Sequence, residues 1–221
     1  MKPKFDPKAD YQPENFEFED KKAVDEILSR YPKFGKKSAV MPLLDLAQRQ
    51  VAKTGPFGDK ETGGGWIPVA AMDKIAEIIE QPKIKVYEVA TFYSMYMLAP
   101  VGKYHIQVCG TTPCWLCGAG NIIKTCKDDI GIGMGETSDD GLFTLSEVEC
   151  LGACANAPML QINSDQYYED LTPERMSEII KLLKDGKEDE IPVGSQTGRK
   201  CSMSAAGPSS LIEQAKKAGV A

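Results

Sequence analysis

Apolar residues recur at three- and four-residue spacing through roughly the first hundred residues, which predicts amphipathic helices. The first helix is expected to begin at Asp20, a suitable N-cap, and to end before Pro32 and Gly35. The other three are expected at residues 42–53, from 66 to about 81, and at 85–98. We expect these four helices to bury their apolar stripes together as a small helical bundle.

The pattern changes after Pro100, which we interpret as the start of a second domain. Residues 104–109 alternate apolar with polar side chains, as in a half-buried strand that exposes His105 on its polar side. The elements expected after it are a helix over 121–129, a strand over 142–149, a hairpin of residues 159–162 and 166–169, and a helix capped by Thr172. This order predicts an α/β domain.

The two ends of the chain lack such patterns. Residues 1–19 are polar, and we expect an extended N-terminal arm that is either a disordered tail or a strap on a partner. Residues 187–221 are rich in Gly, Ser, Lys and Ala, and we interpret them as a C-terminal tail laid along partner subunits. Between the ends we expect a four-helix domain at 20–99 and the α/β domain at 100–186.

Composition narrows the class of protein. The chain has 221 residues, a hydrophobic fraction of 42% and a charged fraction of 26%, values that are ordinary for globular proteins. Its net charge of −6 disfavours a nucleic-acid partner. No apolar run approaches the roughly 20 residues of a membrane-spanning helix, so we expect no direct membrane span. The first residues do not resemble an Arg-rich transit peptide, so an organellar location would imply either a processed form or an incomplete start.

Six of the seven cysteines lie between residues 109 and 154. Two pairs stand out, because four residues separate Cys109 from Cys114 and three separate Cys150 from Cys154. Each pair is expected where a strand runs out into a loop. Four thiolates can therefore converge on one point, and the question is what they hold.

Three uses of these cysteines do not involve iron. A disulfide framework is disfavoured by the odd number of cysteines and by the lack of a secretory signal. Cys114 and Cys117 form a CxxC motif, which supplies an attacking thiol in a thioredoxin-like setting. That use leaves the other three cysteines of the two pairs unexplained. An all-cysteine zinc site accepts such pairs only at the loose end of its usual spacing.

A [2Fe–2S] cluster takes two thiolates on each iron, so two separated pairs are its natural signature. A second ligand set also fits the sequence. Cys109, Cys114 and Cys117 have the plant-type ferredoxin spacing C-x4-C-x2-C, which one distant cysteine completes. The small residues around Cys150 and Cys154 favour the two-pair set. Small side chains let backbone N–H groups approach sulfur, which a negatively charged cluster needs.

Three stretches make the chain resemble one family. Residues 148–159 (VECLGACANAPM) resemble the second ligand motif of the thioredoxin-like [2Fe–2S] subunit of respiratory complex I. This is the family of NADH dehydrogenase ubiquinone flavoprotein 2 and of the E-type subunit of bacterial NADH-quinone oxidoreductase. Residues 86–96 (VYEVATFYSMY) are similar to a second signature of the family, and residues 100–109 (PVGKYHIQVC) to the approach to the first pair. Residues 51–65 look like an insertion relative to that family.

This resemblance implies an α+β fold of two domains, in which an N-terminal helical bundle precedes a thioredoxin-like α/β domain that carries a [2Fe–2S] cluster. The cluster ligands that it implies are Cys109, Cys114, Cys150 and Cys154. Cys117, Cys126 and the isolated Cys201 then lie outside the ligand set. Pro158 occupies a place similar to that of the thioredoxin cis-proline, so we expect a cis bond between Ala157 and Pro158.

The same resemblance implies an electron-transfer subunit of NADH:ubiquinone oxidoreductase, whose cluster exchanges one electron with the flavin of a neighbouring subunit. The chain has no GxGxxG fingerprint and no Walker loop, so FMN and NADH are expected on a flavoprotein partner. We therefore expect no catalytic residue and no complete active site on this chain. The second partner implied is the large iron–sulfur subunit of complex I. The location implied is the matrix side of the mitochondrial inner membrane, as a peripheral subunit.

Other functions remain open from the sequence. The equivalent subunit of an NAD-linked hydrogenase or formate dehydrogenase shares the cluster motifs, although the C-terminal stretch 197–211 favours the mitochondrial complex. A thioredoxin-like thiol oxidoreductase using Cys114 and Cys117 would turn over disulfides without iron. A scaffold stabilised by zinc would lack the visible absorption of an iron–sulfur cluster and would therefore be colourless.

Overall fold

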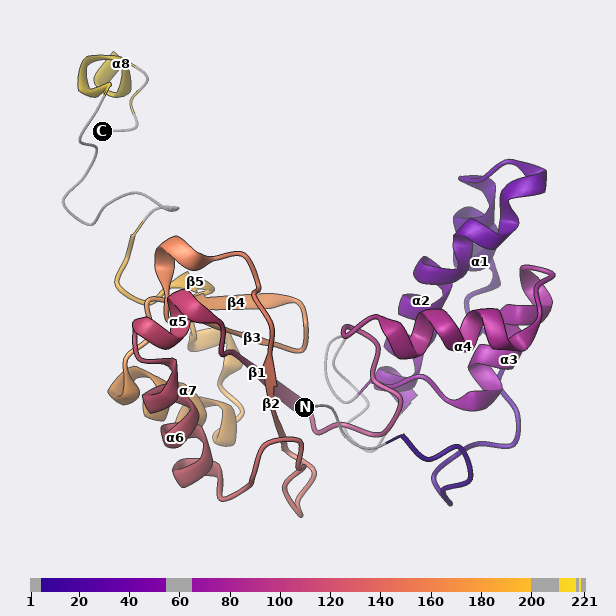
Figure 1. Ribbon diagram of the computed structural model, residues 1–221, viewed down its shortest axis with the longest axis horizontal. Coiled ribbons are helices and arrows are strands. Elements are labelled where there is room, and N and C mark those ends of the chain that lie inside the picture. The colour runs from indigo at the N-terminus through magenta and orange to yellow at the C-terminus, as the bar shows by residue number, and fades with distance from the viewer. Residues whose placement is uncertain (1–4, 55–64, 200–210, 218, 220–221) are drawn as a thin grey trace. The chain divides into compact units, whose positions relative to one another are not determined.

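The computed structural model describes residues 5–54, 65–199, 211–217 and 219 (Figure 1). By its contacts the chain divides into two compact units. The first contains residues 1–105 and 133–146, and the second contains residues 106–132 and 147–221. The expected insertion falls largely on residues 55–64, and Cys201 falls on 200–210, so both lie outside the described residues.

The four helices predicted for the first unit are present. They are α1 (Lys21–Ser29), α2 (Val40–Thr54), α3 (Val69–Ile78) and α4 (Lys83–Phe92), with a 3-10 helix η1 (Lys33–Ala39) before α2. The Asp20 side chain caps α1 as predicted, because it accepts a hydrogen bond from the Ala23 N–H at 2.8 Å.

The predicted end of the fourth helix is wrong. Helix α4 stops at Phe92 instead of Leu98, since the backbone of Met97 is held by tertiary hydrogen bonds. Its carbonyl accepts from the Ile67 N–H at 2.8 Å, and its N–H donates to the Gln48 side chain at 2.8 Å. These contacts outweigh the helical preference of the local sequence.

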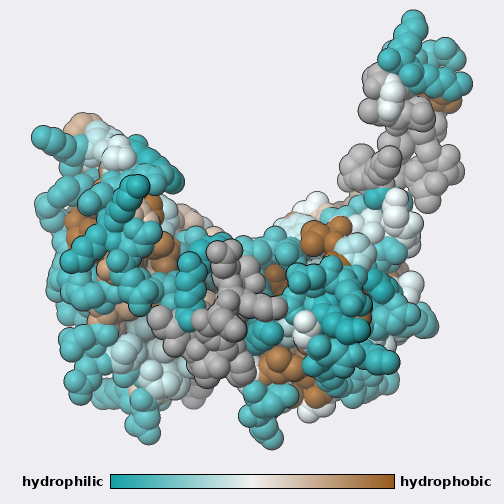
Figure 2. Space-filling view, turned by 180° about the vertical axis from the view of Figure 1, so that it is seen from behind, coloured by the Kyte–Doolittle hydropathy of each residue, from teal (hydrophilic) through white to brown (hydrophobic). Residues whose placement is uncertain are grey.

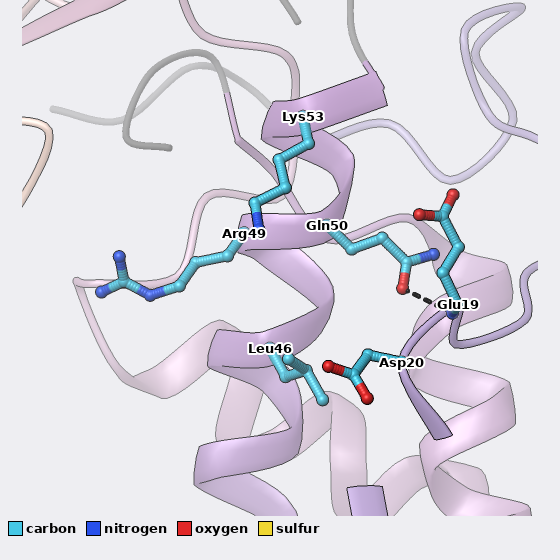
Figure 3. Close-up of a pocket in the computed structure, with 6 residues that line it drawn as sticks. All are labelled: Glu19, Asp20, Leu46, Arg49, Gln50 and Lys53. Carbon is cyan, nitrogen blue, oxygen red and sulfur yellow. Dashed lines mark hydrogen bonds between the residues drawn. The ribbon is translucent and has the colours of Figure 1, made fainter. Parts of the chain in front are cut away.

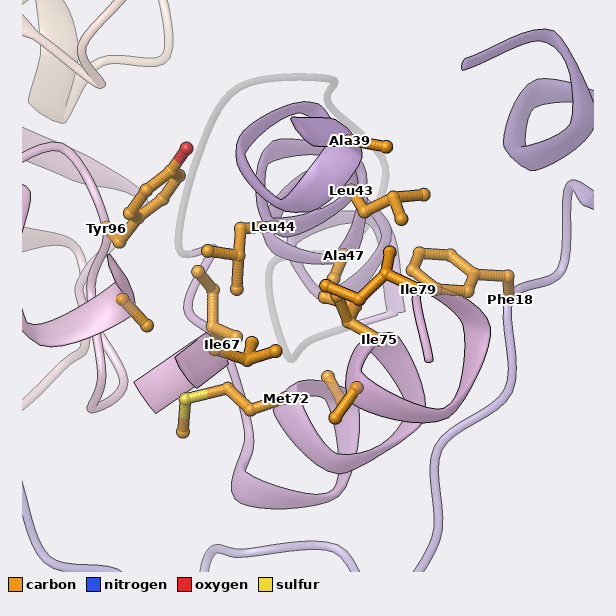
Figure 4. Packing of buried hydrophobic residues seen from close by; sticks show 14 of the residues in the cluster. Phe18, Ala39, Leu43, Leu44, Ala47, Ile67, Met72, Ile75, Ile79 and Tyr96 are labelled. Carbon is orange, nitrogen blue, oxygen red and sulfur yellow. The ribbon is translucent and has the colours of Figure 1, made fainter. Parts of the chain in front are cut away.

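One hydrophobic cluster holds the helices of this unit together (Figure 4). Leu43, Leu44 and Ala47 of α2 face Met72 and Ile75 of α3, and all five are fully buried. The apolar stripes therefore meet as the helical spacing predicts.

Residues 5–19 make several contacts with this same unit. Phe18 lies in the hydrophobic cluster with 4% of its surface exposed, and the Tyr11 ring packs edge-on against Trp66. The Gln50 side chain of α2 accepts from the Glu19 N–H at 3.0 Å and donates to the Glu17 carbonyl at 2.8 Å (Figure 3). The segment contains turns at residues 7–8 and 10–11, and these contacts make it part of the folded unit.

A surface pocket lies beside that attachment (Figure 3). Its lining residues are Glu19, Asp20, Leu46, Arg49, Gln50 and Lys53. Acidic and basic side chains face it together, so it presents no single charge that would select an anion or a cation.

The strands form one mixed sheet in the order β2-β1-β3-β4-β5. Their bounds are β1 Tyr104–Cys109, β2 Phe143–Val148, β3 Leu160–Ile162, β4 Gln166–Glu169 and β5 Gly194–Ser195. Strand β3 runs antiparallel to β1 and to β4, whereas β5 runs parallel to β4. The Tyr104 N–H donates to the Leu142 carbonyl and the Gly110 N–H to the Val148 carbonyl, so β1 and β2 run parallel.

Helices α6 (Ala119–Ile130) and α7 (Pro173–Lys184) pack against each other on one face of this sheet (Figure 1). Thr172 caps α7 as predicted, by accepting from the Arg175 N–H at 3.2 Å. The β3–β4 hairpin also turns where predicted, with positive φ at Asn163 and Ser164. A short helix α5 (Thr112–Leu116), which the sequence analysis did not predict, follows β1.

The prediction that His105 is exposed is wrong. All six residues of β1 are buried and His105 is only 3% exposed, so both faces of this central strand are covered. The His105 Nε2 is hydrogen-bonded to the Ser146 hydroxyl at 2.9 Å. The side chains of β1 therefore alternate between two buried faces of the sheet, one apolar and the other polar.

Part of the expected tail belongs to the second unit. Strand β5 pairs with β4, and Ile191 before it is buried. The 3-10 helix η3 (Glu188–Glu190) and the helix α8 (Ile212–Lys217) are the other elements of the C-terminal segment in the described residues.

In the described part of the chain, no helix is long and apolar enough to cross a membrane. Most of the surface seen in Figure 2 is hydrophilic, with a few small hydrophobic patches.

Phe18 and Phe34 provide a matched test of the packing of the N-terminal segment. Phe18→Ala is expected to lower the free energy of unfolding by about 3–5 kcal/mol, because it empties a site in the core. Phe34→Ala, at a position 91% exposed, is expected to change it by less than about 0.5 kcal/mol. Urea denaturation followed by circular dichroism measures both. Equal, small effects would show that residues 5–19 do not belong to this core.

Candidate metal centre

The order of the strands brings the two cysteine pairs to one place. Strand β1 lies between β2 and β3, and β2 and β3 are consecutive in the chain. At the end of β1, the Gly110 N–H donates to Val148 and the Cys109 N–H to Met159, both at 3.2 Å. The connection 149–158 must therefore cross over the end of β1, where the first pair emerges.

The first pair is buried. Cys109 is the last residue of β1 and Cys114 lies in α5, and each is 1% exposed. Ala119 and Met159 pack with them in one apolar cluster. The Thr111 hydroxyl lies 3.3 Å from the Cys109 Sγ.

The second pair lies at the surface. Cys150 and Cys154 are exposed, and their Sγ atoms are 3.5 Å apart. Cys154 begins the 3-10 helix η2 (Cys154–Asn156). Gly152 between them has a φ of +89°, a conformation that residues with a Cβ rarely adopt. This turn lets the chain fold back so that both sulfurs face the same point.

Each pair holds one thiol of lowered and one of raised pKa. Burial raises the pKa of Cys109. Hydrogen bonds outweigh this effect and lower that pKa, and their donors are the hydroxyl and N–H of Thr111, the Leu151 N–H and the Cys114 thiol. Burial, and then the hydrogen bond to Cys109, raises the pKa of Cys114 to about 12.

In the second pair, the Gly152 N–H and then the Cys154 thiol lower the pKa of Cys150. The hydrogen bond to Cys150 is the main reason why the pKa of Cys154 is raised. Within each pair, the hydrogen bond between the two thiols lowers the pKa of one and raises the pKa of the other. Backbone N–H groups add further donors aimed at sulfur, since the Met159 N–H also acts on Cys114.

The two pairs interact with each other. The Thr111 hydroxyl lowers the pKa of both Cys109 and Cys150, so it lies within reach of both sulfurs. Negative charge on Cys109 opposes the deprotonation of Cys150 and Cys154, and negative charge on Cys154 opposes that of Cys114. The structure thus brings together all four cysteines of the two pairs.

Two further cysteines lie apart from this group. Cys117 is exposed and follows α5 as its C-cap. Cys126 is buried in α6, where burial and then Asp129 raise the pKa of its thiol to about 12. Cys114 interacts with Cys109 instead of Cys117, and its raised pKa is the opposite of that of an attacking thiol in a CxxC motif.

The chemistry of the donor set can be compared with that of a [2Fe–2S] cluster, which takes two thiolates at each iron. Within residues 5–54, 65–199, 211–217 and 219, no group of three or more His, Cys, Asp or Glu is arranged to hold one metal ion. Four thiols in two pairs, with N–H and hydroxyl donors aimed at their sulfurs, match the requirement of the cluster in chemistry.

The expected cis bond between Ala157 and Pro158 is present. Sequence reasoning missed several residues that hold the two loops. The Tyr167 hydroxyl donates to the Leu151 carbonyl at 2.9 Å, and Arg199 donates to the Ala155 carbonyl at 2.9 Å. Together with Thr111, these side chains act through contacts between distant segments, so no local pattern in the sequence marks them.

Comparison with known proteins gives a consistent result. The sequence model of the thioredoxin-like [2Fe-2S] ferredoxin family matches residues 24–184. The NADH-quinone oxidoreductase E-type subunit of Rickettsia felis is 54% identical over 168 residues, which cover 75% of this chain and 93% of that protein. The mitochondrial NADH dehydrogenase [ubiquinone] flavoprotein 2 of Dictyostelium discoideum is 46% identical over 204 residues, covering 92% of this chain and 76% of the relative.

Among solved structures, an air-oxidised NAD+-reducing [NiFe]-hydrogenase is similar in fold, with a TM-score of 0.56 and 16% identity. The match covers 73% of this chain and 26% of the hydrogenase chain. At this identity the likeness concerns the fold alone.

Serine variants separate the two ligand sets. Replacing Cys109, Cys114, Cys150 or Cys154 by Ser is expected to reduce the iron and acid-labile sulfide of the purified chain and to alter or abolish the EPR signal of the dithionite-reduced form, because the two-pair set makes each of them a ligand.

The matched control is Cys117→Ser, which is expected to leave the metal content and the signal unchanged. Loss of the signal in Cys117→Ser, with retention in the Cys150 or the Cys154 variant, would establish the plant-type set and contradict the two-pair set.

Proposed function

Since this chain belongs to the thioredoxin-like [2Fe-2S] ferredoxin family, we propose that it is the electron-transfer subunit of the NADH-oxidising module of respiratory complex I. The relatives that support this proposal carry the names of NADH:quinone oxidoreductase subunits and match most of this chain. In this role a [2Fe–2S] cluster held by the chain supplies one-electron exchange with the flavin of a neighbouring subunit.

The observation that carries the proposal is the convergence of Cys109, Cys114, Cys150 and Cys154. Their sulfurs belong to two segments, 109–114 and 150–154, that the sheet brings to one end of β1. We propose these four as the ligands. One pair is buried and the other exposed, so the centre would lie at the surface of its domain, where a partner can approach it.

The surrounding residues have a recognisable task. Ala119 and Met159 exclude water from the buried pair. The hydroxyl of Thr111 and the N–H groups of Leu151 and Gly152 donate to sulfur and stabilise its negative charge. These donors are fixed by the fold before any electron arrives, so they would stabilise added charge without rearranging.

The rest of the assembly would supply the substrates. The sequence has neither a dinucleotide fingerprint nor a Walker loop, so FMN and NADH are assigned to a flavoprotein partner. The large iron–sulfur subunit of complex I is the second partner that we propose. We also propose a peripheral place on the matrix side of the mitochondrial inner membrane, and the mitochondrial relative supports this location. The domain boundaries at residues 20–99 and 100–186 are likewise proposals.

An apolar surface next to the site suggests where the flavoprotein partner binds. Trp115 and Leu116 directly follow the buried Cys114 on α5, yet they are 66% and 71% exposed. Large exposed tryptophans are unusual on a surface that stays in water and are common at the centres of interfaces. Electron transfer also needs the flavin close to the four cysteines. We therefore assign this surface to the flavoprotein partner.

The division of labour between subunits can be tested by optical spectroscopy. The cluster-loaded chain alone is expected to stay oxidised in excess NADH and to bleach when the FMN-containing partner is added. The reason is that NADH gives up two electrons together, whereas a [2Fe–2S] cluster accepts one. Dithionite, which should reduce the chain directly, is the control. Rapid bleaching by NADH alone would contradict the proposal.

Trp115→Ala is expected to weaken binding of the flavoprotein partner at least about tenfold, because interface tryptophans often contribute about 2 kcal/mol or more. Val193→Ala, at a position 58% exposed on another segment, is the matched control and should bind normally. Titration calorimetry measures both affinities, and an unchanged visible spectrum shows that the site is intact. Normal binding by Trp115→Ala would rule out this surface.

A further inference from the structure

Arg199, in the C-terminal segment, reaches back to the loop that carries the second cysteine pair. Its Nη2 donates to the Ala155 carbonyl at 2.9 Å, one residue after Cys154. Its Nε donates to one carboxylate oxygen of Asp170 at 3.0 Å, and Nη2 also donates to the other oxygen. One guanidinium thus joins the cysteine loop to the end of β4.

Asp170 is the other half of this junction. Its N–H donates to the Asn156 carbonyl at 2.8 Å, so it holds the same loop through its backbone. Its carboxylate also accepts from the Ser195 hydroxyl at 2.6 Å, which joins β5 to the junction. The side chains of Arg199 and Asp170 are 17% and 11% exposed, so the ion pair is largely shielded from water. Hydrogen bonding to Arg199 lowers the pKa of Asp170, so the pair stays charged at neutral pH.

The cysteine loop is also attached on its other side, where the Tyr167 hydroxyl donates to the Leu151 carbonyl. Near Cys154, the Asn156 side chain adds a hydrogen bond to the Glu169 carboxylate at 2.5 Å. Cys150 and Cys154 themselves are exposed, and burial does little to fix them. Tyr167 fixes the loop just after Cys150, and the Arg199–Asp170 pair fixes it just after Cys154. The two attachments therefore bracket the second pair.

We infer that Arg199 is a positioning residue, which clamps residues 154–156 so that the second cysteine pair keeps the geometry needed to hold the cluster. The inference rests on the proposed function, because it assumes that this pair binds iron. It requires arginine specifically. A planar guanidinium can grip a carboxylate with two N–H groups and still donate to a carbonyl, whereas a lysine ammonium acts as a point charge.

Arg199→Gln and Arg199→Lys test the clamp in the full-length, cluster-loaded chain. Both are expected to release iron to a chelator faster than the parent, by about tenfold for Gln, the size typical of residues that orient metal ligands. A changed EPR line shape of the reduced form is also expected, because the ligand loop adopts a range of positions. Adding Asp170→Asn to Arg199→Gln removes the Asp170 carboxylate that the first change leaves unpaired. Faster iron release in this double variant is then not caused by a general loss of stability.

Arg175→Gln is the matched control. Arg175 binds Gln196 of the same C-terminal segment at 3.0 Å and is similarly shielded, but no bond to the cysteine loop is among its hydrogen bonds in the described residues. It should release iron at the parental rate. Parental release and EPR line shape in both Arg199 variants, or equal acceleration in Arg175→Gln, would overturn the clamp.

Amide hydrogen exchange of the cluster-free chain separates failure of the clamp from failure of the proposed function. The amides of residues 153–157 are expected to exchange faster in Arg199→Gln than in the parent or in Arg175→Gln, whether or not iron is ever bound. If the parent binds no iron but this difference is present, the proposed function fails and the clamp on the loop stands. If exchange is unchanged, the clamp is wrong.

Discussion

The site depends on the position of β1 between β2 and β3. Because β2 runs parallel to β1 and β3 runs antiparallel to it, β2 ends and β3 begins beside the last residue of β1. The connection between them has no route except over that end. The same end releases the segment with Cys109 and Cys114, so the backbone ladder alone brings two distant cysteine motifs together.

Local interactions then determine how each pair behaves. Burial and close packing fix the first pair, whereas the second is exposed and is held by the loop that carries it. That loop is fastened by the Tyr167 hydroxyl at one point and by the Arg199–Asp170 ion pair at another. An electron-transfer centre needs this combination, because a rigid interior limits rearrangement on reduction and an exposed side gives a partner access.

The sequence predicted the features that depend on local chemistry. The caps at Asp20 and Thr172, the hairpin turn and the cis bond before Pro158 are all present. The family was also identified correctly from its motifs. The failures share a cause, since each depends on segments distant in sequence. His105 lies on a strand whose two faces are both buried, α4 ends early because Met97 bonds to remote groups, and no periodicity marks Arg199 as a contact of the cysteine loop.

The central claim is that four thiolates from two loops hold one binuclear iron centre. Anomalous diffraction at the iron absorption edge, from crystals of the cluster-loaded chain, tests it most directly. The account predicts two iron peaks at the end of β1, within bonding distance of Cys109, Cys114, Cys150 and Cys154 and of no other cysteine. A single metal peak among these sulfurs, or iron bonded to Cys117, would contradict it.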